Sequence, residues 1–194
     1  MKDTAQISSL KGLLEEGARF KRLLTTDVQL SSLEAQLRAS MVSMDPSDPK
    51  AFANACTGPG IYHIDAKFPF STWEDLKEWG DLWGRIGAPD GPSGISRFYP
   101  KRAMHHVSKI RSGTYIPFYL GKEVNVQRRL NGHAKGKKEA STYSLKLNSR
   151  PDVILGIEFR FSFVPIPANP DAFYCIALLE HALRERLHPI IGRQ

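Results

Sequence analysis

Five side chains that can move protons or stabilise negative charge occur in series along the chain. Tyr62 and Tyr119 each lie in a short apolar run, and Arg129 follows Tyr119 by ten residues. His133 lies one helical turn beyond Arg129, and Glu180 stands among apolar residues near the C-terminus. Phenol, guanidinium, imidazole and carboxylate groups in one set can together perform acid–base and electrostatic catalysis.

Strands over residues 60–65 and 115–120 would position the two tyrosines. Ile61 and Tyr62 are neighbours, so they point to opposite faces of the sheet. By the same alternation, Phe118 and Leu120 share one face and Tyr119 takes the other. Antiparallel pairing can therefore put both tyrosines on one face. A phenol with a pKa near 10 is a poor base, so a cation must favour its phenolate or the phenol only positions water.

A helix over residues 123–134 would position the arginine and the histidine. Arg129 and His133 are four residues apart and lie on one helical face. Arg128 points about 100° away from Arg129, which makes Arg128 the weaker candidate for this role.

The two short runs, Gly60-Ile61-Tyr62 and Tyr119-Leu120-Gly121, resemble the paired signature tripeptides of the GIY-YIG nuclease family. The resemblance implies an α+β fold in which a central three-stranded antiparallel sheet is flanked by helices. It also implies hydrolysis of phosphodiester bonds in double-stranded DNA. Leu120 replaces the usual central isoleucine, a swap that conserves volume in a strand.

The resemblance implies a role for each residue of the series. Tyr62 and Tyr119 match the two tyrosines, Arg129 matches the arginine, and His133 completes the arginine–histidine pair of the restriction-type members. Lys122 falls where some members place a lysine. Glu180 matches the glutamate that holds one divalent metal ion, Mg²⁺ or Mn²⁺.

The chain departs from the family pattern in two places. Members commonly carry an asparagine after a proline near the C-terminus, whereas Pro189 is followed here by no asparagine. Gln194 either substitutes for it or the role is absent. The tyrosines are also far apart in sequence, so residues 66–114 are interpreted as an insertion.

Positive charge is concentrated in one third of the chain. The whole chain has a net charge of +7, and residues 91–146 contain twelve Lys or Arg against Glu123 and Glu139. Such a segment favours a polyanion-binding face over a merely solubilising surface. The candidates for DNA contacts are Arg97, Lys101, Arg102, His105 and His106 in the insertion, Arg128, and the phosphate-binding lysines Lys135, Lys137 and Lys138.

The basic insertion and the absence of a recognisable targeting domain resemble the small type II restriction endonucleases of the family. A palindromic target would then require a homodimer or a transient pair. Two alternatives stay open: a structure-specific or repair nuclease, and a catalytically inactive nucleic-acid-binding relative.

Two regions are expected around this centre. Residues 1–57 are interpreted as a helical arm and linker, with helices over 8–24 and from a Ser31/Glu34 capping box towards Met41. Residues 58–194 form the nuclease domain. Its remaining predicted elements are a helix over 73–83, a loop over 84–94, a polar loop over 134–148, a strand over 153–164 and a helix over 172–187.

The amino-acid composition indicates the cellular compartment. Cys56 and Cys175 are too few for a disulfide framework, and no apolar stretch approaches the roughly 20 residues that span a bilayer. We therefore expect a protein of the reducing cytoplasm with no membrane partner.

Overall fold

The computed structural model describes residues 2–85, 96–135, 144–167 and 170–192, without the side chains of 2–11, 13 and 170–173. The α-helices are α1 (Lys2–Leu24), α2 (Asp27–Ala39), α3 (Pro49–Ala53), α4 (Trp73–Arg85), α5 (Pro100–Ala103), α6 (Val107–Arg111), α7 (Val126–Lys135), α8 (Pro151–Ile154) and α9 (Pro170–Leu187). Short 3₁₀ turns are η1 (Met104–His106) and η2 (Leu147–Ser149). The strands are β1 (Val42–Met44), β2 (Gly60–Lys67), β3 (Arg97–Phe98), β4 (Ile116–Glu123), β5 (Glu158–Pro165) and β6 (Ile191–Gly192).

The centre of the fold is an antiparallel sheet in the order β1-β5-β2-β4, which confirms the α+β class. The described sheet has four strands, whereas three were expected. The extra edge strand is β1, which pairs with residues 159–161 of β5. The sequence pattern had continued a helix through Met41, but α2 ends at Ala39 and buried Met44 joins the core.

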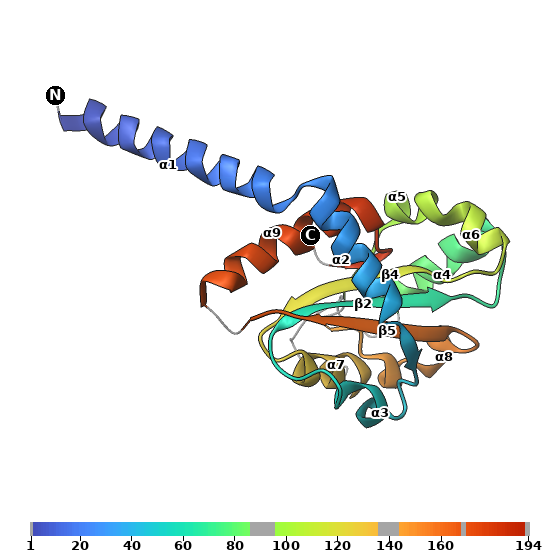
Figure 1. Cartoon of the computed structure of the whole chain (residues 1–194). Helices are drawn as coiled ribbons and strands as arrows, with labels where there is room; N and C mark the ends of the chain where they lie inside the picture. Colours follow the sequence, from blue (N-terminus) through green and yellow to red (C-terminus); the bar gives the residue numbers. More distant parts are fainter. Residues whose placement is uncertain (1, 86–95, 136–143, 168–169, 193–194) are drawn as a thin grey trace.

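Helices cover both faces of this sheet. One face carries Ile61 and Leu120 and packs against the apolar sides of α2 and α9. The opposite face carries Tyr62 and Tyr119 and packs against α3, α4, α7 and α8. Figure 1 shows α9 on one side of the sheet, α3, α7 and α8 on the other, and α1 extending away from the body.

Two predicted element starts are wrong, and each has a local cause. α2 begins at Asp27 because the Thr26 side chain caps it and accepts from the backbone N–H of Gln29, so Ser31 is no cap. Residues 153–157 are no strand. Pro151 begins the short helix α8, and Gly156, with φ of 73°, turns the chain into β5.

Much of the insertion over residues 66–114 is built into the core. Trp79 and Trp83 of α4 contact Phe118 of β4, and the Trp83 indole N–H donates to the Ser96 carbonyl at 2.7 Å. β3 pairs with β6, so the insertion is joined to the C-terminal segment. Residues 86–95, which contain most of the predicted loop over 84–94, lie outside the described residues.

Candidate active site

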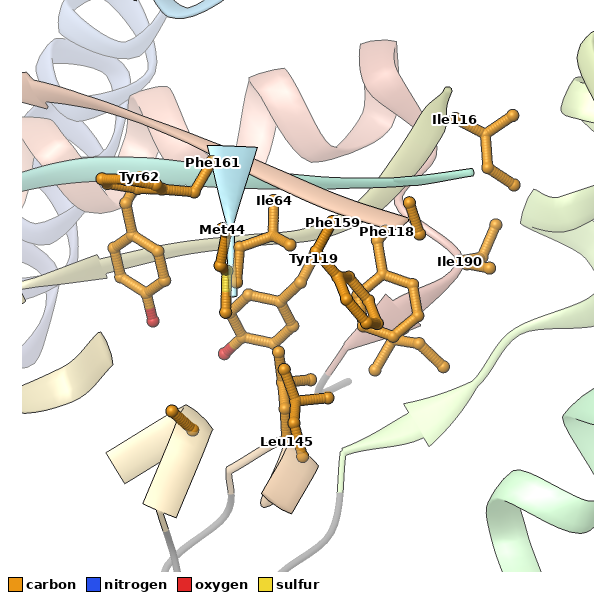
Figure 2. Close-up of a cluster of buried hydrophobic side chains, with 14 of the residues drawn as sticks. Met44, Tyr62, Ile64, Ile116, Phe118, Tyr119, Leu145, Phe159, Phe161 and Ile190 are labelled. Atoms are coloured by element: carbon orange, nitrogen blue, oxygen red, sulfur yellow. The ribbon is translucent and has the colours of Figure 1, made fainter. Parts of the chain in front are cut away.

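Tyr62 and Tyr119 lie side by side on one face of the sheet, as the alternation predicts. β2 and β4 are antiparallel, with Tyr62 opposite Gly121 and Ile64 opposite Tyr119. The two rings are 6.0 Å apart between centroids and inclined by 26°. Tyr62 is fully buried and Tyr119 is 7% exposed. Figure 2 shows both phenol rings pointing away from the sheet in the same direction.

One part of the strand prediction is wrong. The register shifts between Ile64 and Asp65, which pair with Tyr119 and Pro117 and leave Phe118 as an extra residue. At such a bulge the strict alternation of faces is lost. Phe118 therefore enters the same core cluster as Tyr119, and Leu120 is on the opposite face.

The last glycine of the second tripeptide makes room for the first tyrosine. A Cβ on Gly121 would lie 2.5 Å from Tyr62 Oη, 2.6 Å from Tyr62 Cζ and 2.9 Å from Tyr119 Cε1. Gly60 is similarly covered by the Phe163 ring and the Val164 carbonyl. Each glycine thus lets a neighbouring group lie directly on the backbone.

We expect Gly121→Ala to displace the Tyr62 hydroxyl from its place beside His133, because the new methyl group would overlap it. The overpacking should also cost about 1–3 kcal/mol of unfolding free energy. The matched control is Gly132→Ala on α7, where a Cβ meets nothing within 4 Å. That change should stabilise the helix by about 0.5–1 kcal/mol. Urea unfolding of both variants checks the opposite signs, and equal effects would contradict this role of Gly121.

His133 is held in one protonation state by its two partners. Its Nδ1 accepts the backbone N–H of Leu145 at 3.0 Å, so the ring proton of a neutral imidazole lies on Nε2. Nε2 is 2.8 Å from Tyr62 Oη and therefore donates to the phenol oxygen. Complete burial, assisted by the charge of Arg129, holds the pKa of His133 well below its usual range. His133 is a hydrogen-bond donor here and has no free nitrogen to act as a base.

Arg129 connects the two tyrosines. Its guanidinium is half-buried and donates to both phenol oxygens. The Tyr119 ring lies beside Tyr62, 6.0 Å away between centroids. Burial and the neighbouring Tyr119 raise the pKa of Tyr62 well above its usual value, and Arg129 opposes that rise. Tyr62 is therefore a neutral phenol at rest, with two donors ready to stabilise a phenolate.

Lys122 and Glu180 lie on the other side of the sheet. Lys122 pairs with Ile61, so it shares the face that α9 covers. On α9, Glu180 lies between Ile176 and Leu183, which pack against that face. The structure therefore brings Tyr62, Tyr119, Arg129 and His133 together and places Lys122 and Glu180 across the sheet from them.

The Glu180 carboxylate already has a cationic partner. It forms an ion pair with Arg184 one helical turn away. Burial raises the pKa of Glu180, and the charges of Arg184 and Lys122 oppose that rise. Among the described residues, no three His, Cys, Asp or Glu side chains gather where they could hold a metal ion. As arranged, these residues do not fit a metal site, because cations surround the single carboxylate.

The residues predicted to contact DNA fall into two groups. Arg97, Lys101, His105, Arg128 and Lys135 are exposed. Arg102 is half-buried, with its guanidinium 4.8 Å from the centre of the Tyr99 ring and 3.3 Å from Glu185.

Two histidines of the insertion also have partners within the protein. The His105 ring stacks on His188 at 3.7 Å, and buried His106 bonds the His188 carbonyl. Arg102 and these two histidines thus help to join the insertion to the C-terminal segment. Lys137, Lys138 and Gln194 lie outside the described residues.

Two groups in this region escaped sequence reasoning. The backbone N–H of Leu145, which fixes the His133 ring, follows residues with no periodic pattern, so no signal marked it. Asp65 and Arg160 form a cross-strand ion pair at 2.7 Å, with His63 Nε2 3.2 Å from the same carboxylate. Strand alternation could have placed Asp65 on the same face as Ile61, the face that α2 and α9 cover, with Ile64 on the other face. No motif marked Asp65, Arg160 and His63 as partners.

Acid should destabilise the fold through His133. Its pKa is well below that of the unfolded chain, which is about 6.5, so the unfolded state binds more protons below that pH. As the pH falls, protonation of His133 in the unfolded chain should by itself lower the free energy of unfolding by up to about 1.4 kcal/mol per pH unit. His133→Asn should reduce the slope between pH 7 and 5 relative to the wild type. Urea titrations at several pH values test this, and equal slopes would contradict it.

Comparison with known proteins found no matching family model, no matching curated protein and no matching solved structure. Of the described helices, none combines the length and the apolar character needed to cross a membrane. The two cysteines are free thiols, Cys56 buried and Cys175 partly exposed. The functional inference therefore rests on the side-chain geometry around Tyr62.

Proposed function

We propose that this protein is a GIY-YIG endonuclease that hydrolyses phosphodiester bonds in double-stranded DNA, as a sequence-specific type II restriction endonuclease. One observation carries the proposal: residues distant in sequence meet at one phenol. Tyr62 Oη accepts from His133 Nε2 and from Arg129, and Arg129 also reaches Tyr119. These are the residue types that the resemblance to the family assigns to the active site.

In the proposed reaction, Arg129 makes the first contact with the substrate phosphate. It is half-buried whereas Tyr62 is fully buried, so a phosphate approaches from the Arg129 side. A guanidinium suits the developing charge on phosphoryl oxygens, and it is placed before the reaction begins. Tyr119 holds the other side of Arg129 and acts as a positioning residue.

Moving Arg129 onto the phosphate would change the state of Tyr62. At rest the two lone pairs of Tyr62 Oη accept from His133 and Arg129. When Arg129 turns to the phosphate, one lone pair can accept a hydrogen bond from the attacking water. His133 keeps donating to Tyr62 Oη, which orients the neutral phenol so that it positions the attacking water; Tyr62 keeps its own proton. His133 takes no proton itself.

The resemblance also implies one Mg²⁺ or Mn²⁺ ion on Glu180, although the residues around Glu180 do not fit a metal site as they are arranged. Mg²⁺ is often bound through one or two carboxylates together with substrate phosphates. The Glu180 carboxylate is paired with Arg184 in this structure, so that ion pair would have to open. The metal requirement is therefore tested separately from the tyrosine site.

The first experiment is cleavage of supercoiled plasmid and phage DNA with Mg²⁺, with Mn²⁺ and with EDTA. A restriction endonuclease gives discrete bands with either ion. Preferential cutting of branched or damaged duplexes would instead support the structure-specific nuclease. Binding to all these DNAs without any cleavage would support the inactive relative and contradict the proposal.

A further inference from the structure

Three histidines meet where the insertion joins the end of α9. The His105 ring stacks on the His188 ring, with 3.7 Å between the centroids and 7° between the planes. His106 Nε2 is 2.9 Å from the His188 carbonyl oxygen, which can only accept, so Nε2 carries a proton. Figure 1 shows α5 and α6, the helices on either side of these residues, beside the C-terminal end of α9. We call His105, His106 and His188 the histidine junction.

His188 lies in an unfavourable backbone conformation. Its φ is 50°, in the left-handed region where the residue that follows a helix is usually a glycine. Pro189 comes next, and a residue before proline favours extended backbone. Such a conformation persists only where the surrounding contacts hold it. The His105 ring and the His106 N–H supply such contacts, so the histidine junction helps to fix the course of the chain after α9.

Cations face the histidine junction from two helices. Arg102 of α5 and Lys109 of α6 act on its rings, and Glu185 of α9 is the carboxylate that opposes them. The Glu185 carboxylate is 3.3 Å from the Arg102 guanidinium, so part of its charge is already neutralised. A further positive charge on the rings is therefore repelled by both cations and receives little compensation.

Proton uptake by these rings opposes the contacts that they make. Burial lowers the pKa of His106, and burial together with the neighbouring His105 lowers the pKa of His188. Both rings are therefore neutral in the closed junction at pH 7. In an open junction their pKa returns to about 6.5, so the open form binds more protons below that pH. Charging both stacked rings would also hold two like charges 3.7 Å apart. Acid therefore favours the open form.

We propose that the histidine junction is a proton-sensitive contact, which holds residues 100–111 against the C-terminal end of α9 at neutral pH and loosens them in acid. This segment has little stability of its own, because α5 has four residues and α6 has five. The inference does not depend on the nuclease proposal, because it uses none of the residues around Tyr62.

Hydrogen exchange of single amides in the full-length protein tests this proposal. The Tyr99 N–H donates to the Ile190 carbonyl at 2.8 Å, at the base of the segment. Its protection factor should be lower than those of the central strand β2, since the junction opens without unfolding of the body. Between pH 7.5 and 5.5 that factor should fall by up to about tenfold for each histidine that stays neutral in the closed form. A fall of less than twofold would contradict the proposal.

A double variant, His106→Gln with His188→Gly, removes the two titrating rings and keeps the backbone contacts. Glutamine can still donate to the carbonyl of residue 188, and glycine adopts a φ of 50° without strain. The Tyr99 protection factor should then change by less than about twofold over the same pH range. A folded double variant that keeps the wild-type pH dependence would overturn the proposal, because other groups would then be responsible.

The titration of His188 by NMR gives a second test that leaves His188 in place. In the wild type its midpoint should lie below about 6.5, the value of a free histidine. In His105→Gln the midpoint should rise towards that value, because the charge of the stacked ring is lost. A stack that served only for packing would not produce this shift. A wild-type midpoint at or above 6.5, or an unchanged midpoint in His105→Gln, would show that the closed junction accepts the proton, and the inference would be wrong.

Discussion

If the proposed function is right, Tyr62→Phe should lower the rate of DNA cleavage by about 10²-fold, the effect expected when the group that positions the attacking water is lost. The substitution removes only the hydroxyl on which His133 and Arg129 converge, and the ring keeps its place in the core. DNA binding should change little, because the fully buried Tyr62 is no phosphate anchor. Single-turnover cleavage rates and binding at matched salt check both parts.

The matched control for this variant is Tyr115→Phe. Tyr115 lies just before β4, and its hydroxyl donates at 3.0 Å to the side chain of Glu158 in β5, which is separated from β4 by β2. Removing that hydroxyl costs one exposed hydrogen bond and should leave cleavage within about twofold. If Tyr62→Phe cleaves DNA at the wild-type rate with its fold intact, the tyrosine pair contributes only to packing of the core.

The sequence predicted this site well where a rule depends only on neighbouring residues, and poorly where the structure depends on a partner strand or helix. Alternation along a strand is local, and it correctly put Tyr62 and Tyr119 on one face. It failed at Phe118 because a bulge depends on the partner strand, here the shift between Ile64 and Asp65. Helical spacing is also local, and Arg129 and His133 do share the face of α7 that reaches the tyrosines.

Errors in the fold arose from a long-range contact in one case and from local turn residues in another. Val42–Met44 is too short to be recognised as a strand, and it forms one because β5 offers an edge. Val153 belongs to an alternating apolar run, yet Pro151 and Gly156 force a helical turn and a left-handed turn around it. Whether a basic side chain is free to contact DNA or is paired within the protein also depends on residues that are distant in the sequence. Arg102 reaches Glu185 of α9, which its own segment does not reveal.

The metal ligand is the part of the proposed site that local rules placed least well. Glu180 stands among apolar residues in the sequence, and it is 9% exposed in the structure. Which cations lie beside the Glu180 carboxylate depends on the neighbouring turn of α9 and on the strand that α9 covers. The contacts are Arg184 on α9 and the charge of Lys122 on β4, on the face opposite to Tyr62. Two roles for Glu180 can therefore be separated by experiment.

Glu180→Gln should lower Mg²⁺-dependent cleavage by about 10³-fold if Glu180 holds the ion, because a neutral amide is a weak ligand for a divalent cation. The amide oxygen can still accept from Arg184, so the fold should survive. Glu185→Gln is the matched control on the same helix: Glu185 is exposed and pairs with Arg102, and its loss should leave cleavage unchanged. The decisive measurement is the Mg²⁺ dependence of single-turnover cleavage in both variants, with urea unfolding alongside. If Glu180→Gln cleaves DNA normally but unfolds more easily, the carboxylate anchors α9 through Arg184 and the metal ion is held elsewhere.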